Sequence, residues 1–154
     1  MQPTKLTWDD LLIQDVDPAE LSACLAPWAF VVQGQVAPIF LNRFGSWFLR
    51  RPDGSVDCLD VLEGTVNNVA PSFEAFSSSV NATSWQEEYL LSRQVFALHQ
   101  AGLVATGSQC YGIPHPCQGF PDPRVEGGFN PRFAMLADLR VWQSICRQAT
   151  GGPP

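Results

Sequence analysis

Residues 44–69 predict three consecutive strands joined by two short turns. The first turn, at 51–55, contains Pro-Asp-Gly: the proline presets a type I turn, and the glycine supplies the left-handed residue that closes a hairpin loop. A Glu-Gly pair at 63–64 breaks the next apolar run in the same way, and residues 65–69 alternate as a half-buried strand does. The segment therefore predicts an antiparallel meander.

Apolar spacing and capping residues place helices on both sides of this meander. The segments 47–49 and 59–62 are too continuously apolar for a sheet with one wet face, so we expect helices to cover it. Helices are predicted to start at Thr7, Asp17, Pro71, Ser84 (a capping-box signature, with the helix running to Gly102) and Asp138, and strands at 30–36 and 38–41. These elements predict a single α+β domain over residues 1–150, with a disordered tail at 151–154.

The apolar positions of these elements define an expected core. Its aromatic and aliphatic members come from both the strands and the helices, as one shared core requires. They are Trp47, Leu49, Leu59, Val61, Phe73, Phe76, Trp85, Phe96, Leu139 and Trp142.

The charge distribution excludes one class of partner. The chain has a net charge of −6 and one lysine, whereas nucleic-acid binding depends on clustered Lys and Arg, so we expect no nucleic-acid partner. Acidic residues gather in the first 30 positions and arginines in positions 124–154. The head is therefore acidic and the tail mildly basic.

Cysteine usage and the N-terminal pattern favour a cytoplasmic protein. Five cysteines with no C-x-x-C motif fit reduced thiols, and Cys24, Cys58 and Cys146 lie in apolar periodic stretches typical of small buried residues. No apolar signal-peptide core precedes the acidic head, and the longest apolar run, 23–32, is too short to cross a bilayer. We therefore expect neither a structural disulfide nor a membrane partner.

Few residues of the chain have side chains suited to metal binding or nucleophilic catalysis. Cys110, His115 and Cys117 have zinc-binding side chains, but their spacing is poor, and a Cys/His pair has nothing to orient its base. We therefore expect no metal, no cofactor and no catalytic residues, that is, a chain that is not an enzyme.

The carboxylates at positions 57, 60 and 63 are predicted to be solvated or edge-protecting charges rather than a catalytic group. Strand alternation predicts that Asp57 and Glu63 share one face and that Asp60 points the other way. Because Asp60 stands between apolar neighbours on a central strand, it requires a partner, which one of the arginines can supply.

The stretch between Cys110 and Pro131 contains repeated prolines and glycines and predicts an irregular loop, which in a compact domain is usually functional or mobile. Aromatic anchors and arginines of the kind found at interfaces fall in and beside this loop. The predicted partner-binding residues are Tyr111, His115, Phe120, Arg124, Phe129 and Arg132. Two alternatives stay open: the aromatics pin the loop to the core, or the loop forms a small-molecule or enzyme site.

Four short segments resemble those of bacterial type VI secretion immunity-like proteins, which are related to the SUKH superfamily of toxin-immunity proteins. They are Phe44–Phe48, Asp60–Gly64, Gln109–Gly112 and the closing stretch at 138–148. The resemblance, which runs from about 32 to 148, implies a compact α+β domain that binds a protein partner such as a toxin, whose basic face an acidic surface would cover. It assigns no functional residue.

Overall fold

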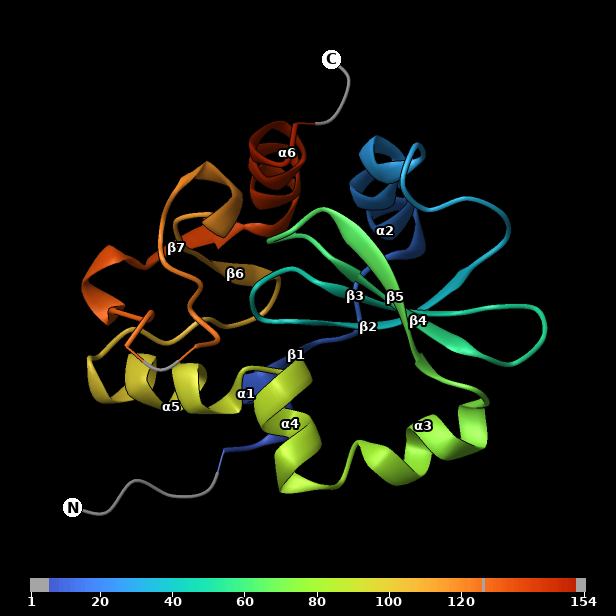
Figure 1. The fold of residues 1–154 in the computed structure, drawn as a ribbon, viewed down its shortest axis with the longest axis horizontal. Helices are drawn as coiled ribbons and strands as arrows, with labels where there is room; N and C mark the ends of the chain where they lie inside the picture. Colours follow the sequence, from blue (N-terminus) through green and yellow to red (C-terminus); the bar gives the residue numbers. More distant parts are fainter. Residues whose placement is uncertain (1–5, 126, 152–154) are drawn as a thin grey trace.

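The meander forms the central sheet of the structure. The computed structural model describes residues 6–125 and 127–151, and the side chain of Cys117 is left undescribed. Five antiparallel strands lie in chain order, and Figure 1 shows them crossing the middle of the molecule. They are β1 (Leu12–Ile13), β2 (Ala37–Asn42), β3 (Trp47–Arg50), β4 (Val56–Asp60) and β5 (Thr65–Ala70).

A second sheet of two antiparallel strands, β6 (Gln109–Gly112) and β7 (Met135–Asp138), stands beside the first. A single backbone hydrogen bond from Tyr111 to the carbonyl of Arg43 links β6 to the turn after β2. Most of β6 falls where the sequence predicted an irregular loop, so that prediction was wrong for residues 110–112. The pairing partner lies some 25 residues further along the chain, beyond the reach of local patterns.

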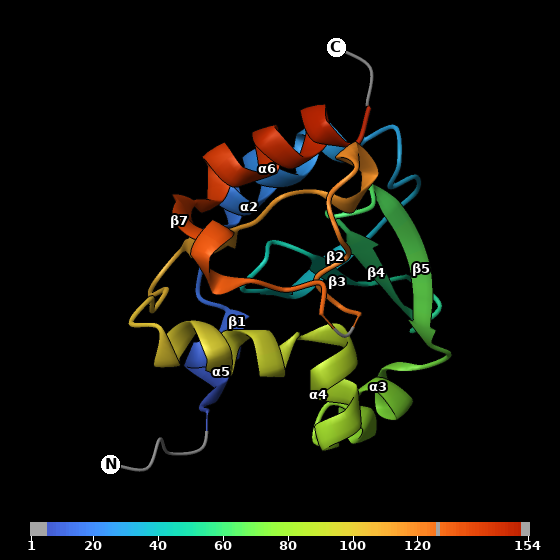
Figure 2. The same cartoon turned by 60° about the vertical axis from the view of Figure 1, so that its left-hand side comes forward.

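Helices cover both sides of the sheets, which confirms the predicted α+β class. In Figure 2, α2 and α6 lie side by side above the strands, and α1, α3, α4 and α5 lie below them. The α-helices are α1 (Trp8–Leu11), α2 (Pro18–Leu25), α3 (Phe73–Ser79), α4 (Thr83–Tyr89), α5 (Ser92–Gln100) and α6 (Leu139–Ala149), and the 3₁₀ turns are η1 (Ala26–Trp28), η2 (Pro116–Gln118) and η3 (Pro131–Phe133). No helix in the described part of the chain is long and apolar enough to span a membrane.

The predicted turn and caps form as their residue types require. Arg51 donates its backbone N–H to the Ser55 carbonyl at 2.8 Å, and Gly54 takes a φ of +90° that closes the hairpin. The side chains of Thr7, Asp17 and Asp138 accept backbone N–H groups at the starts of α1, α2 and α6. These three predicted helix starts are confirmed.

Two local predictions were wrong: one predicted strand does not form, and one predicted helix is interrupted. Residues 30–36 form no strand: Val31 and Val32 both donate to the Trp28 carbonyl and prolong the turn after η1. The predicted helix from Ser84 to Gly102 is two helices, because Leu91 adopts a left-handed φ of +53°.

Both ends of α4 differ from the prediction. Asn42 donates its side-chain amide to the Tyr89 carbonyl, and so engages the last turn of α4 from the sheet. The N-cap of α4 is Ala82, which makes no side-chain cap, so the capping box predicted at Ser84 is absent. The apolar stripe alone could not reveal either feature.

The core follows the prediction closely. Eight of the ten predicted residues are buried, Phe73 is half-buried and packs against the core, and Phe96 is half-buried in a surface hollow. Gln143 on α6 lies inside this core, where its Oε1 accepts the indole N–H groups of Trp28 at 2.7 Å and Trp47 at 3.0 Å. Its Nε2 donates to the Gly45 carbonyl at 2.8 Å, so one amide side chain connects α6 to η1 and to the meander.

Candidate functional site

Arg124 tethers the Pro- and Gly-rich segment to the central sheet. Its guanidinium pairs with Asp60 at the end of β4, with Glu63 in the following turn at 3.0 Å and with Asp122 at 3.0 Å. The arginine partner that the sequence required for Asp60 is therefore present. Burial opposes charge on Arg124, but hydrogen bonds and charges from Asp122 and Asp60 hold its pKa above the ordinary value.

The same cluster corrects the predicted orientation of the three carboxylates. Asp60 and Glu63 reach one guanidinium, whereas Asp57 pairs with Arg51 at 2.8 Å. Strand alternation stops at Asp60, where the chain enters the turn at 61–64, so Glu63 does not continue the strand pattern. Because Arg124 is bound to the chain's own carboxylates, it is a structural tether rather than an exposed donor.

Replacing Arg124 by methionine is expected to destabilise the fold by about 1–2 kcal/mol near neutral pH, because three carboxylates lose their cation at a site that is only partly solvated. Burial raises the pKa of Asp122, but its bonds to Arg124 outweigh this and lower it below the ordinary 3.8. Asp122 therefore contributes to the free energy of unfolding above pH 3.8, and this contribution is lost as pH falls through its lowered pKa. The difference in unfolding free energy between wild type and Arg124→Met should thus become smaller in acid.

Urea unfolding from pH 7 to pH 3 measures this effect. Arg93→Met is the matched control, since its pair with Glu87 is largely exposed and should contribute under about 0.5 kcal/mol. Equal losses in the two variants at pH 7 would show that Arg124 is not a tether.

Tyr111 and His115, two of the predicted partner-binding residues, are buried. Tyr111 on β6 is fully enclosed, and its hydroxyl accepts from Ala105 N at 2.9 Å and donates to the Leu103 carbonyl at 3.1 Å. The His115 ring packs on Trp142 with centroids 5.2 Å apart. For these two residues the structure matches the alternative in which the ring pins the loop to the core, and neither offers a surface to a partner.

Burial disfavours the charged forms of two of the cysteine and histidine side chains, Cys110 and His115. Burial raises the pKa of the Cys110 thiol, and burial lowers the pKa of His115 even though a hydrogen bond to the Val61 backbone opposes this. Within residues 6–125 and 127–151, excluding the Cys117 side chain, no three His, Cys, Asp or Glu side chains form a group able to hold a metal.

Two of the remaining predicted residues line an apolar pocket of about 290 Å³, which we call the aromatic pocket. Phe120 is half exposed and Phe129 is half-buried, and both line the pocket, whereas Arg132 is an exposed residue of η3 that is not part of the lining. The pocket is lined by Ile113, Pro114, Phe120, Pro121, Pro123, Gly127, Gly128, Phe129, Asn130 and Phe133. Phe133, which sequence reasoning missed, is 66% exposed at the rim.

A concave face of about 780 Å³ on another part of the surface, which we call the acidic groove, concentrates negative charge. Three helix starts meet there, and carboxylates serve as their caps or first-turn residues. The groove brings Asp138 to the acidic head, an arrangement that the sequence does not reveal. Its carboxylates are Asp9, Asp10, Asp15, Asp17, Glu20 and Asp138.

Two arginines, Arg43 and Arg140, lie beside this groove, but they do not neutralise all of its carboxylates. Arg43 is buried, and its guanidinium donates to the backbone carbonyls of Asp9, Gly107 and Gln109 rather than to a carboxylate. Burial lowers the pKa of Arg43, although nearby acidic groups oppose this. Arg140 pairs with Glu20 at 2.6 Å at the solvent-exposed surface. Among residues 6–125 and 127–151, no arginine side chain forms an ion pair with the other five carboxylates of the groove.

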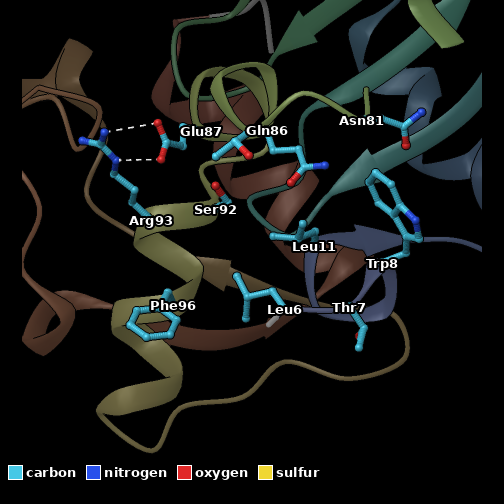
Figure 3. Close-up of a pocket in the computed structure, with 11 residues that line it drawn as sticks. Leu6, Thr7, Trp8, Leu11, Asn81, Gln86, Glu87, Ser92, Arg93 and Phe96 are labelled. Carbon is cyan, nitrogen blue, oxygen red and sulfur yellow. Dashed lines mark hydrogen bonds and ion pairs between the residues drawn. The ribbon is translucent and has the colours of Figure 1, made fainter. Parts of the chain in front are cut away.

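A third hollow of about 770 Å³ is lined by residues of α1, α4 and α5 (Figure 3). Leu6, Leu11 and Phe96 provide its apolar surface, and the Trp8 ring stands at one end near the amides of Asn81 and Gln86. Glu87 and Arg93 are paired at the other end. None of the predicted site residues lines it.

Comparison with known proteins adds no identification: neither the protein-family models nor the curated proteins contain a match to this chain. The fold, the acidic groove and the aromatic pocket therefore supply the argument about function.

Proposed function

We propose that this chain is a non-catalytic, cytoplasmic protein-binding module whose acidic groove covers a basic face of a partner protein. The observation that carries the proposal is the convergence of six carboxylates on one concave face, with Arg43 turned inward to backbone carbonyls. Complementary charge speeds encounter and suppresses wrong partners. The resemblance to immunity proteins suggests a basic toxin as the partner, with the chain as its neutralising antidote.

The decisive experiment uses the product of the gene adjacent to the one encoding this chain. That product expressed alone should arrest growth, and coexpression with this chain should restore it. Asp9→Asn combined with Asp15→Asn should weaken binding about tenfold at low salt, and added salt should weaken wild-type binding. Both side chains are exposed, and asparagine tolerates the φ of +57° at position 15.

Glu74→Gln combined with Glu88→Gln is the matched control, because it removes the same charge from α3 and α4, outside the groove. This variant should bind as wild type does. A neighbour that neither arrests growth nor binds would contradict the immunity role, and binding that ignores salt and the Asp9/Asp15 variant would contradict the groove.

A further inference from the structure

The hairpin of β6 and β7 joins the two surfaces described above. Asp138, the last residue of β7, lines the acidic groove, and Phe133, two residues before the strand begins, lines the aromatic pocket. Residues 135–138 are extended, at about 3.4 Å per residue, and Phe133 precedes them at the end of η3, so the path from Phe133 to Asp138 spans at most about 17 Å. One extended segment of seven or eight residues could therefore reach both surfaces along β7.

The outer edge of β7 is open in the described structure. Among residues 6–125 and 127–151, β6 is the only strand paired with β7. Met135 is 53% exposed and Leu136 is 36% exposed, so apolar side chains of this edge strand face water on a strand of only four residues. Unpaired edges of this kind are templates for an added strand.

The hydrogen-bond register shows which backbone groups point outward. Leu139 donates across the hairpin to Ser108, whereas the Tyr111 N–H leaves the hairpin for the Arg43 carbonyl. Since bonding alternates along an antiparallel pair, residues 135 and 137 bond to β6, and the N–H and C=O of Leu136 point away from it. An added strand would pair with Leu136.

We propose that the partner docks by adding an extended strand antiparallel to β7, an inference that rests on the proposed function. Basic side chains of the added strand would lie in the acidic groove, and an aromatic side chain would enter the aromatic pocket. Charge decides which end of the added strand is basic, because carboxylates lie at the Asp138 end of β7 and the exposed Arg132 lies at the pocket end. Antiparallel pairing then requires the basic residues to precede the aromatic one by about five positions. Main-chain bonds supply affinity, and the groove and pocket supply specificity.

The probe is the synthetic peptide acetyl-Arg-Lys-Val-Thr-Val-Thr-Phe-Glu-amide, whose fourth residue would face Leu136. Wild-type protein should bind it with salt-sensitive affinity. N-methylation of the fourth residue should weaken binding at least tenfold, because it removes the donor to the Leu136 carbonyl, whereas N-methylation of the fifth residue, whose N–H points away from β7, should change it less than threefold. The reversed sequence should bind at least tenfold more weakly.

Leu136→Pro tests the same bond from the protein side. Because the Leu136 N–H points outward on an edge strand, proline should be tolerated, leaving the circular dichroism spectrum unchanged and peptide binding at least tenfold weaker. Phe133→Ala should weaken binding without touching the backbone and serves as the second variant if Leu136→Pro does not fold. Unchanged peptide binding by a folded Leu136→Pro variant would overturn the proposed strand addition.

The outcomes of these experiments distinguish failure of strand addition from failure of the proposed function. Peptide binding that needs Asp9 and Asp15 but ignores N-methylation and Leu136→Pro would overturn strand addition and leave the acidic groove supported. Binding of the adjacent-gene product without any peptide binding would do the same. A wild-type dimer that Leu136→Pro converts to monomer would assign the edge to a second copy of this chain and overturn the proposal.

Discussion

Gln143→Leu is expected to destabilise the protein by about 3–6 kcal/mol, because it leaves two buried indole N–H groups and one buried carbonyl without partners. Leucine is close in size to glutamine, so the loss arises from hydrogen bonding rather than from a cavity. Since Trp28 and Trp47 share the single acceptor Oε1, no nearby rotamer change restores both bonds.

Urea unfolding monitored by tryptophan fluorescence measures this loss. Gln148→Leu is the matched control: it makes the same chemical change on the exposed side of α6 and should alter the free energy of unfolding by less than about 0.5 kcal/mol. Indistinguishable stabilities for the two variants would mean that Gln143 does not organise the core.

Trp142→Ala is expected to cost about 3–5 kcal/mol through the cavity that it leaves under α6. The ring is 2% exposed, packs on His115 and donates its N–H to the Phe44 carbonyl at 2.7 Å. Gly45 and Gly112 pack so closely on it that a Cβ at either position would lie 2.8 Å and 3.2 Å from ring atoms. The surroundings are shaped around this ring and cannot collapse easily.

Trp8→Ala provides the comparison for this measurement, because Trp8 is 41% exposed at the rim of the hollow in Figure 3. Its removal should cost less than half as much as that of Trp142. A third variant, Trp142→Phe, should fall between them, since it keeps an aromatic ring but leaves the Phe44 carbonyl unpaired. Equal losses for Trp142→Ala and Trp8→Ala would contradict the core assignment.

The elements that the sequence predicted correctly are those whose causes lie within a few residues. Proline, aspartate and glycine at 52–54 define a turn by their own backbone preferences, and Asp17 before Pro18 defines a helix start. Burial of Trp47 and Trp142 follows from apolar periodicity. The need of Asp60 for a cation also follows from local reasoning, because a carboxylate between buried neighbours requires one.

The errors and omissions concern residues whose environment is set by distant parts of the chain. Tyr111 looked like an interface aromatic, but pairing of β6 with β7 and the hydroxyl contacts near Ala105 bury it. Nothing within a few residues of Leu91 predicts its left-handed backbone, since the apolar stripe continues across it.

The sequence by itself therefore determined the meander, most helix starts, the composition of the core and the acidity of the head, because each depends on local conformational preference or on hydrophobic periodicity. Three features were decided by the tertiary structure alone. Asp138 lies in one groove with the carboxylates of the first 30 residues, Arg124 is paired with the chain's own carboxylates, and the outer edge of β7 is unpaired in the described structure. These features depend on contacts between residues tens to more than a hundred positions apart. Such contacts form only when the chain packs and have no signature in a short window of sequence.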